Sequence, residues 1–334
     1  MLTSTVAKSL ALLACLALAL ATGFASIALG QTAMSLDTVL HALFAYDDTV
    51  VNHIIVRANR LNRAVLALLV GSSLAISGAL MQALTRNALA SPSLFGINAG
   101  ALFFVALAYT FLSLTSVSQF IGFAFLGAAV ASVLVYLLGM SGPAGLSPVR
   151  IVLAGAAMTA LFVAFTQGLL ILNQESLEGI LYWLGGSVAG TSFATMTPFV
   201  PFFIAALLVT ALLVRQVNVM MLDETVARSL GQRVLATRLA LGAVIVVLAG
   251  GSVALAGLIG FIGLIVPHLA RGLFGRDHRW VLPASALLGA SLLLGADTLS
   301  RFIVPPQEIP VGALTALVGT PFFIAVARKR SPAL

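Results

Sequence analysis

The stretch Ile151–Leu172, with the sequence IVLAGAAMTALFVAFTQGLLIL, contains no charged side chain. An α-helix needs about 20 predominantly apolar residues to cross the roughly 30 Å hydrocarbon core of a bilayer. Similar uncharged runs recur along the chain, and most charged residues lie between them. With 60% hydrophobic and 8% charged residues, this chain of 334 residues has too few charges to cover a water-soluble fold. The sequence therefore predicts an all-α membrane protein.

We expect ten transmembrane helices in one bundle, forming a single transmembrane domain over residues 1–334. The first segment resembles a lipoprotein signal peptide around Cys15, but the run between Lys8 and Cys15 is too short for the apolar region of such a peptide. We therefore expect an uncleaved first span. The ten predicted segments are Leu10–Leu29, Leu66–Leu84, Phe95–Leu112, Phe120–Leu138, Ile151–Leu172, Pro198–Val214, Leu239–Val253, Leu258–Leu269, Leu282–Ala296 and Val311–Val326.

The stretch from Leu239 to Ala270 is almost continuously apolar and has two interpretations. As one helix it would be about 48 Å long, which exceeds one crossing and falls short of two. Arginines flank it on both sides, so a chain that keeps both groups in the cytoplasm must go out and return. Two full spans, or one span and a re-entrant segment, both satisfy this condition. The turn is expected among Gly250, Gly251, Gly257, Gly260 and Gly263.

The distribution of basic residues predicts the orientation. With both termini in the cytoplasm, thirteen Lys and Arg residues fall on the cytoplasmic side and four on the opposite side. Such an excess of cytoplasmic Lys and Arg is typical of membrane proteins. The four exceptions are Arg57, Arg60, Arg63 and Arg301, whereas the cytoplasmic set is Lys8, Arg86, Arg150, Arg215, Arg228, Arg233, Arg238, Arg271, Arg276, Arg279, Arg328, Lys329 and Arg330.

The sequence contains no phosphate-binding loop, no metal-ligand cluster and almost no ionisable group in the middle of a span. Neither lysine, Lys8 or Lys329, lies in a Gly-rich phosphate loop, so no Walker A site is present. The histidines lack metal-ligand spacing and the single cysteine cannot build a thiolate site, so we expect no metal and no cofactor. Because the middles of the spans are almost free of ionisable groups, a proton relay or a catalytic pair is also not expected. These absences suggest a multispan protein, not itself an enzyme, that is driven by a partner.

A short helix is predicted between the sixth and seventh spans, in segment 220–233. Asp223 can cap its N-terminus and Gly231 suits the left-handed position after its C-terminus. So short a helix is marginal alone and must dock on something. It either packs against its own bundle or inserts into a cytoplasmic partner as a coupling helix. The residues assigned to such coupling are Leu222, Asp223, Glu224, Val226, Ala227, Arg228, Ser229, Leu230 and Gly231.

This segment and three further groups of motifs together resemble one family. The groups are Ser77-Gly-Ala-Leu-Met-Gln82 with Arg86-Asn-Ala-Leu-Ala-Ser-Pro92; Gly260-Phe-Ile-Gly-Leu-Ile-Val-Pro-His268; and Ala296-Asp297 with Glu308-Ile-Pro310 and Gly319-Thr-Pro-Phe-Phe323. In this order and spacing they resemble the permease subunits of ABC importers for ferric siderophores, haem and cobalamin. The match covers residues 57–327, nearly the whole chain.

The resemblance implies a set of partners and their contact residues. It implies ten helices per subunit, a second permease that is identical or paralogous, two cytoplasmic ATPase subunits and an external substrate-binding protein. Residues 223–231 would enter the ATPase cleft. Arg57, Arg60 and Arg301 match arginines that meet acidic residues of the docked binding protein. The alternative for these arginines is headgroup anchoring, which is the role expected for Arg63. Asp297 and Glu308 flank the outer loop and are expected to pair with Arg301.

The resemblance also implies the path and the cargo. The path would follow the fifth and tenth spans with parts of the third and eighth, and its lining residues would include Asn98, Thr159, Thr166, Gln167 and Thr315. We expect a permease subunit of an ATP-driven importer that carries a ferric siderophore across the bacterial inner membrane. Cobalamin or haem is the alternative cargo, and an ion-coupled secondary transporter is the alternative of another class.

Overall fold

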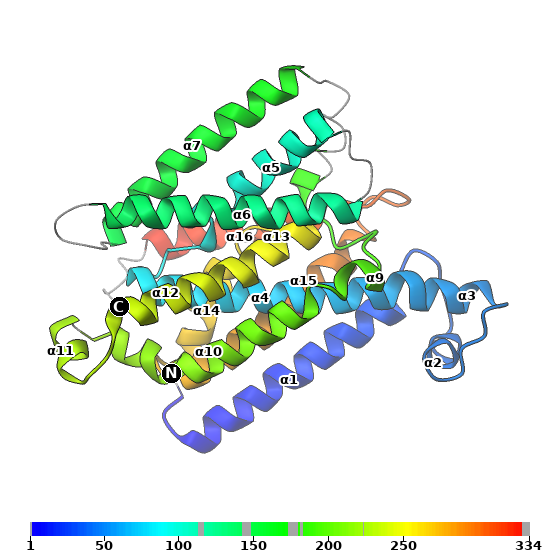
Figure 1. Ribbon diagram of the computed structural model, residues 1–334. Coiled ribbons are helices and arrows are strands. Elements are labelled where there is room, and N and C mark those ends of the chain that lie inside the picture. The colour runs from blue at the N-terminus through cyan, green and yellow to red at the C-terminus, as the bar shows by residue number, and fades with distance from the viewer. Residues whose placement is uncertain are drawn as a thin grey trace.

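The computed structural model describes residues 2–112, 117–141, 148–172, 180, 183–222 and 224–328. Within these ranges the chain is a bundle of helices (Figure 1). The α-helices are α1 (Thr5–Ala28), α2 (Leu36–Phe44), α3 (Val51–Ile54), α4 (Asn62–Thr85), α5 (Ile97–Leu112), α6 (Val117–Met140), α7 (Pro148–Leu172), α9 (Phe193–Met196), α10 (Val200–Met220), α11 (Glu224–Ser229), α12 (Val234–Ile245), α13 (Gly251–Ala256), α14 (Ile262–Phe274), α15 (His278–Ser300) and α16 (Val311–Arg328).

Three further helical segments connect these elements. The π-helical turns η1 (Ile55–Leu61) and η3 (Val246–Gly250) join α3 to α4 and α12 to α13 without a break, and the 3₁₀ turn η2 (Pro92–Phe95) precedes α5. In the described part of the chain, seven helices are long and apolar enough to cross a membrane, and three shorter apolar helices are α5, α14 and α16. Each of the ten predicted segments overlaps one of these helices. The all-α membrane fold is therefore confirmed, whereas the number of crossings stays a prediction.

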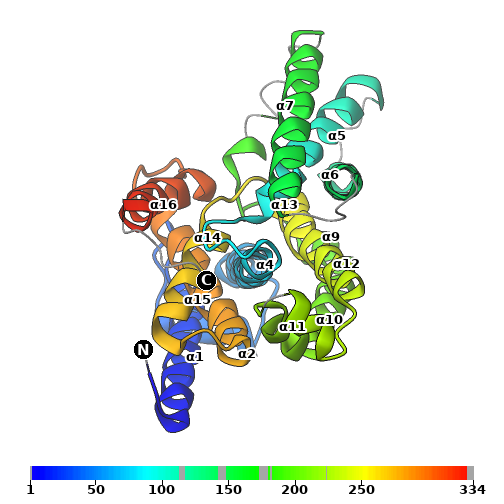
Figure 2. The ribbon, with the colours of Figure 1, turned by 90° about the vertical axis from the view of Figure 1, so that its left-hand side faces the viewer.

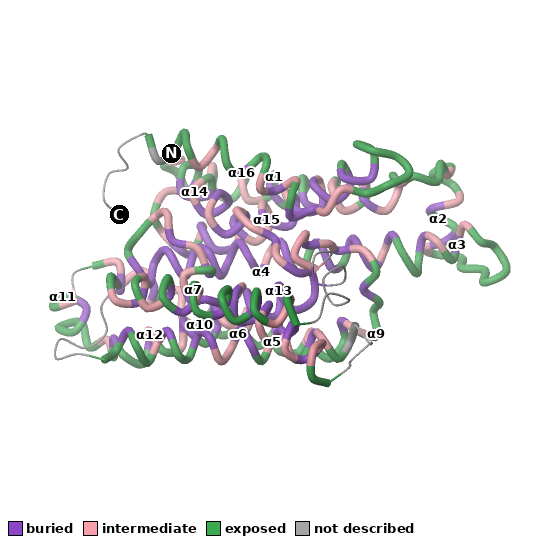
Figure 3. The backbone as a smooth tube through the Cα atoms, turned by 90° about the horizontal axis from the view of Figure 1, so that it is seen from above, coloured by how far each residue is buried: buried purple, intermediate pink, exposed green. Residues whose placement is uncertain are grey.

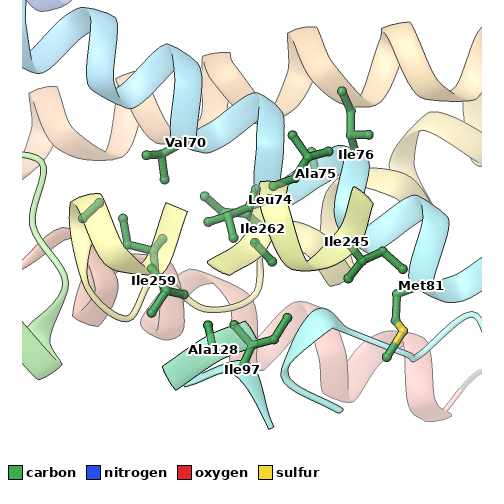
Figure 4. Close-up of a cluster of buried hydrophobic side chains, with 14 of the residues drawn as sticks. Val70, Leu74, Ala75, Ile76, Met81, Ile97, Ala128, Ile245, Ile259 and Ile262 are labelled. Carbon is green, nitrogen blue, oxygen red and sulfur yellow. The ribbon is translucent and has the colours of Figure 1, made fainter. Parts of the chain in front are cut away.

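Helix α4 forms the centre of the bundle. Its apolar residues are buried by helices on several sides, and Figure 4 shows Val70, Leu74 and Met81 in one cluster with side chains from other elements. Figure 3 shows the same arrangement as burial, because purple dominates α4 while much of α1 and α11 is green. A helix that is apolar all round suits this central position. A movement of α4 would therefore shift the helices that pack around it.

Helices α4 and α15 approach closely at a pair of glycines. A Cβ added to Gly71 would lie 2.4 Å from the carbonyl oxygen of Gly289, and a Cβ added to Gly289 would lie 2.4 Å from the carbonyl oxygen of Gly71. Helices α4 and α14 also approach closely at a pair of glycines, since a Cβ on Gly78 would lie 1.9 Å from the carbonyl oxygen of Gly263. Small residues at the contact allow helices to approach closely in lipid, where no hydrophobic effect drives them together.

The turn in the apolar stretch after Leu239 lies at only some of the glycines at which the sequence analysis expected it. Gly250, Gly251 and Gly263 all lie within helical segments, and the break falls between Ala256 and Ile262. Gly257 has a φ of +69°, a conformation that glycine adopts without strain. Phe261 also has a positive φ of +67°, which is uncommon for a residue with a side chain. Its ring lies against α16, because a Cβ on Gly319 would be 2.3 Å from Cγ of Phe261.

The bundle has two chemically different ends. The α11 end is the end at which α4, α10 and α14 finish and α12 and α15 begin; the backbone N–H of Leu2 also donates to the carbonyl oxygen of Leu273 there. The α2 end carries α2, α3, η1 and the last residues of α1 and α15 (Figure 1). Arg57, Arg60, Arg63 and Arg301 all lie at the α2 end, so the predicted segregation of arginines corresponds to a physical separation.

The outer helices expose apolar side chains to their surroundings. Leu212 of α10 is 77% exposed and Leu153 of α7 is 64% exposed. Helices α7 and α16 lie on the side of the bundle away from α1 and α10 (Figure 2). A water-soluble protein rarely exposes so much continuous apolar surface. A bilayer, or a second membrane subunit, is the environment in which these faces are stable.

Candidate functional site

Arg60 at the α2 end is folded back against the end of α1. Its Nη1 donates to the carbonyl oxygens of Ala28 at 2.8 Å and Ile27 at 3.2 Å, and its Nη2 donates to the carbonyl oxygen of Thr32. Only 4% of Arg60 is exposed. The last carbonyl groups of a helix lack partners within it, so Arg60 satisfies the C-terminus of α1. Gly30 makes this possible, since a Cβ there would lie 2.9 Å from Cζ of Arg60.

Arg63 forms a buried ion pair with two carboxylates. Its Nη2 lies 2.6 Å from Oδ1 of Asp297, and its Nη1 lies 2.7 Å from Oε2 of Glu308. The Asp297 side chain is fully buried, whereas a third of the Glu308 side chain is exposed. Arg63 therefore does not anchor a lipid headgroup as the sequence suggested, because its charge is neutralised inside the protein.

Arg301 completes this cluster from the end of α15. Its Nη1 donates to the carbonyl oxygens of Ser26 at 2.7 Å and Leu29 at 2.8 Å, and its Nη2 pairs with Asp297. The predicted pairing of Asp297 with Arg301 is thus present, whereas Glu308 pairs with Arg63 instead. Arg301 is only 2% exposed. The outer cluster, which we define as Arg60, Arg63, Arg301, Asp297 and Glu308, ties the ends of α1, α4 and α15 together.

Of the three arginines assigned to binding-protein docking, only Arg57 is exposed. Its guanidinium carbon lies 4.5 Å from the ring centroid of Tyr46, a cation–π contact that holds the side chain without hiding its charge. Arg60 and Arg301 differ from the expectation because their guanidinium groups bind backbone carbonyl groups of the α1 end. The sequence contained no signal for these contacts, since a carbonyl acceptor is present at every residue.

The predicted coupling segment at the α11 end contains α11 itself. Glu224 accepts hydrogen bonds from Arg228 at 2.6 Å and from Arg238 of α12 at 2.9 Å. Although partial burial opposes ionisation, the bonds from Arg228 and Arg238 lower the pKa of Glu224 below its ordinary value. The carboxylate is therefore charged at neutral pH, and the pair with Arg238 ties α11 to α12. Asp223, the predicted cap, lies outside the described residues.

The end of α11 and its outer face match the sequence analysis. Gly231 has a φ of +79°, and its N–H donates to the carbonyl oxygen of Arg228 at 2.9 Å, which closes the helix. Ala227 is buried against the bundle, whereas the apolar residues on the other side are exposed. Those residues are Leu222 at 46%, Val226 at 45% and Leu230 at 63% exposed. The helix thus packs on its own bundle and still presents an apolar surface outward.

Arg86 makes a contact to this segment that the sequence analysis did not assign. It follows the last residue of α4 and has a φ of 50°, a left-handed conformation that turns the chain. Its Nη2 donates to the carbonyl oxygen of Met220 at 3.1 Å and to that of Leu222. These carbonyl groups lie at the end of α10, immediately before α11. Arg86 therefore connects the central helix α4 to the segment that leads into α11.

A buried polar contact also joins α4 to α14 near this end. Gln82 of α4 is fully buried; its Nε2 donates to the carbonyl oxygen of Gly263 at 3.3 Å, and its Oε1 accepts from Arg271. Buried polar groups require such partners, because an unmade hydrogen bond in a low-dielectric interior is unfavourable. Pro267 in α14 lies between these two contacts and has no N–H to donate. Helices α4 and α14 are thereby held in one register.

Two of the residues assigned to the path use their hydroxyl groups within their own helices. Oγ1 of Thr166 donates to the carbonyl oxygen of Phe162 at 2.7 Å, and Oγ1 of Thr315 donates to that of Gly312 at 2.9 Å. Both threonines are at least 95% buried. Their hydroxyl groups therefore serve local hydrogen bonds and are turned away from solvent.

The remaining path residues have more open positions. Gln167 on α7 is exposed, and Thr159 on the same helix and Asn98 on α5 are partly exposed. The structure therefore separates the five residues into an exposed or partly exposed group and a buried pair. The sequence could not make this distinction, since a polar side chain between apolar neighbours is compatible with either environment.

Comparisons with known proteins agree with this architecture. The model of the FecCD transport family matches residues 18–329. YfiZ of Bacillus subtilis, named as a probable siderophore transport system permease protein, is 46% identical over 305 residues, which are 91% of each chain. HmuU of Yersinia pestis, a hemin transport system permease protein, is 40% identical over 270 residues, covering 79% of this chain and 80% of its own.

A solved structure has the same fold. It is an inward-facing conformation of a metal-chelate type ABC transporter, which matches with a TM-score of 0.84 at 29% sequence identity. The superposition covers 95% of this chain and 98% of the other. The agreement extends along almost the full length of both proteins, so it concerns the whole bundle.

Proposed function

This chain belongs to the FecCD transport family, and from that premise we propose that it imports a ferric siderophore delivered by an external binding protein. It is a transmembrane permease subunit of an ABC importer, and ATP is hydrolysed by a separate ATPase subunit. The importer further requires a substrate-binding protein and a second permease. The 46% identity to a siderophore permease over 91% of both chains is the observation that favours this cargo.

Uptake by the reconstituted importer tests the cargo. Proteoliposomes that contain this permease with its ATPase and binding protein should accumulate iron-55 supplied as a ferric siderophore, and only when ATP is present. Hemin is the comparison substrate, because a hemin permease is 40% identical to this chain. Uptake of hemin or cobalamin without uptake of any ferric siderophore would reject the siderophore assignment. Uptake driven by an ion gradient without the ATPase would reject the mechanism.

For the orientation, we propose that the α11 end faces the cytoplasm of a bacterial inner membrane. The separation of thirteen basic residues from four supports this direction, because cytoplasmic loops carry the excess of Lys and Arg. Both chain termini would then be cytoplasmic. A reporter enzyme fused after Lys329 should be active only in the cytoplasm; periplasmic activity would contradict the assignment.

The apolar face of α11 is our proposed contact with the ATPase. Leu222, Val226 and Leu230 are exposed beside charged residues at the one end where a cytoplasmic partner can reach them. Short helices with an apolar face are recognised by grooves in partner proteins. Leu230→Asp should weaken co-purification of the ATPase, whereas Arg233→Ala at the same end should not. Equal retention of the ATPase by both variants would reject the contact.

Arg86 is proposed as the positioning residue that conveys motion of this helix. The hydrogen bond from its guanidinium to the carbonyl oxygen of Leu222 links the base of α11 to α4. The pair between Glu224 and Arg238 links α11 to α12 in parallel. When the ATPase subunits close and displace α11, both helices would be pulled, and α4 contacts α15 and α14 through its glycines. A change at α11 would thus reach the centre of the bundle.

At the opposite end, we propose that Arg57 pairs with an acidic side chain of the binding protein. Its planar guanidinium is suited to bidentate binding of a carboxylate. Arg60 and Arg301 contribute by holding the α1 and α15 ends, which support the loops around Arg57.

For the translocation path, we propose the face of α7 and α16 that is directed toward the second permease. Thr159 and Gln167 on α7 and Asn98 on α5 would lie nearest to the cargo.

A further inference from the structure

A groove of about 540 Å³ runs between α10 and α15 close to the α11 end. Leu207 and Leu212 of α10 and Leu282 of α15 form its walls, and Ile76 of α4 lies at its base. Ala286 and Pro283 keep the α15 side shallow, because neither has a long side chain. The groove is open toward the surroundings of the bundle, and Leu212 is 77% exposed. In a membrane this surface lies within reach of lipid.

Two arginines stand at the mouth of the groove. Arg215 of α10 and Arg279 of α15 both line it, and both are exposed. Among the described residues, neither guanidinium has a carboxylate within salt-bridge distance. Asp277 interacts electrostatically with Arg279, and its Oδ1 accepts hydrogen bonds from Nδ2 of Asn218 and from the backbone N–H of Arg279. The mouth is therefore positively charged.

The charged and the apolar residues of the groove are separated along α10. Arg215 follows Leu207 by eight residues, a rise of about 12 Å along α10. The arginines lie within two turns of the helix ends, whereas Leu207 lies further inside α10. Arginines at helix ends place their charge at the interface. An apolar groove with cations at its shallow end is complementary to an acyl chain below a phosphate.

We propose that this groove binds an anionic phospholipid, with its phosphate between Arg215 and Arg279 and one acyl chain along Leu207 and Leu282. Basic pockets between transmembrane helices bind anionic headgroups by this combination of charge and shape. A zwitterionic lipid gains less, because its own ammonium group offsets the phosphate. The site lies on the side of the bundle away from α7 and α16, so a second permease on that face leaves it accessible (Figure 2).

An acidic side chain of the ATPase is the alternative partner for the two arginines. It would account for the charge at the mouth but not for the apolar groove beneath it. A lipid accounts for both features. The two partners also make different predictions, since only a lipid is affected by changes in the depth of the groove.

Native mass spectrometry of the permease purified with its ATPase tests the proposal. The complex is equilibrated with mixed micelles of phosphatidylglycerol and phosphatidylcholine, and the retained lipids are counted. The unmodified complex should retain phosphatidylglycerol preferentially. Arg215→Gln combined with Arg279→Gln should reduce that preference about thirtyfold, which corresponds to roughly 1 kcal/mol for each of the two arginines near the headgroup. Arg233→Gln, at the same end but outside the groove, is the matched control.

A second variant, Ala286→Phe, fills the groove without changing its charge. It should also reduce retention of phosphatidylglycerol while leaving the ATPase bound. The proposal is overturned if the double arginine variant keeps the preference, or if Arg233→Gln loses it equally. It is also overturned if the double arginine variant releases the ATPase while lipid retention is unchanged, because the arginines would then serve the protein partner.

Discussion

Arg86 donates a hydrogen bond to the carbonyl oxygen of Leu222, and this contact joins the end of the central helix α4 to the base of α11. Helix α4 in turn meets α15 at Gly71 and Gly289, where the two backbones touch without intervening side chains. These two contacts connect α11 through α4 to α15, so a displacement of α11 would be transmitted to the helices that form the core.

The outer cluster should depend most strongly on Asp297. Asp297→Asn removes the buried carboxylate that serves both Arg63 and Arg301, so two buried cations lose a counter-charge. Breaking a buried pair in this way destabilises a protein by about 3–5 kcal/mol. Thermal unfolding in detergent should give a clearly lower midpoint. Glu308→Gln, at a partly exposed side chain, should have a much smaller effect, and equal midpoints for the two variants would argue against the cluster as described.

The crossing of α4 and α15 can be tested with two glycines of the same helix. Gly289→Ala places a methyl group 2.4 Å from the carbonyl oxygen of Gly71, whereas a Cβ on Gly295 meets nothing within 4 Å. Forcing extra volume into a packed contact destabilises by about 1–3 kcal/mol. We expect Gly289→Ala to lower the unfolding temperature and Gly295→Ala to leave it unchanged or slightly raised. The reverse order would mean that the helices do not touch at Gly71.

Docking of the binding protein should separate Arg57 from Arg60. Arg57→Glu reverses an exposed charge, so affinity for the binding protein should fall about tenfold while the permease remains folded. Arg60→Glu places a carboxylate against the carbonyl oxygens of Ala28 and Thr32 and should lower stability first. Surface plasmon resonance measures the first effect, and thermal unfolding measures the second. Unchanged affinity of Arg57→Glu would remove Arg57 from the docking surface.

The bond between α11 and α12 should restrain α11. Arg238→Gln breaks the bond to Glu224 that crosses between the helices, whereas Arg228→Gln breaks only the bond within α11. A partly exposed pair contributes up to about 1 kcal/mol, equivalent to a roughly fivefold rise in amide exchange. Hydrogen exchange of residues 224–231 should therefore increase more for Arg238→Gln. An equal increase for both variants would show that α12 does not hold the helix.

The sequence sufficed for features that repeat along the chain. Uncharged runs such as Ile151–Leu172 predict spans because crossing a bilayer imposes a length, and the position of Gly231 predicts a helix end because a left-handed residue favours glycine. The division of arginines between the two ends also followed from the positions of the basic residues between the predicted spans. These signals are local or periodic, so no knowledge of packing was needed.

Contacts to backbone carbonyl groups could not be predicted in the same way. Arg60, Arg301 and Arg86 all donate to carbonyl oxygens, which every residue possesses, so neither the partner nor the burial is encoded in a motif. The sequence could not place the turn after α13 more narrowly than among five glycines, for a related reason. Gly250 and Gly263 lie within helices, where the missing side chain allows close packing. The sequence alone cannot distinguish a glycine used for close packing from one used in a turn.

The most direct test is the ratio of siderophore imported to ATP hydrolysed by reconstituted importer carrying Arg86→Ala. If Arg86 conveys the motion of α11 to α4, the variant should still bind the ATPase and hydrolyse ATP. Its imported iron-55 per ATP should fall about tenfold, since a charged hydrogen bond contributes roughly 1.5–3 kcal/mol. Arg86→Lys should recover part of the ratio, and Arg233→Ala should leave it unchanged. A normal ratio for Arg86→Ala would contradict the account.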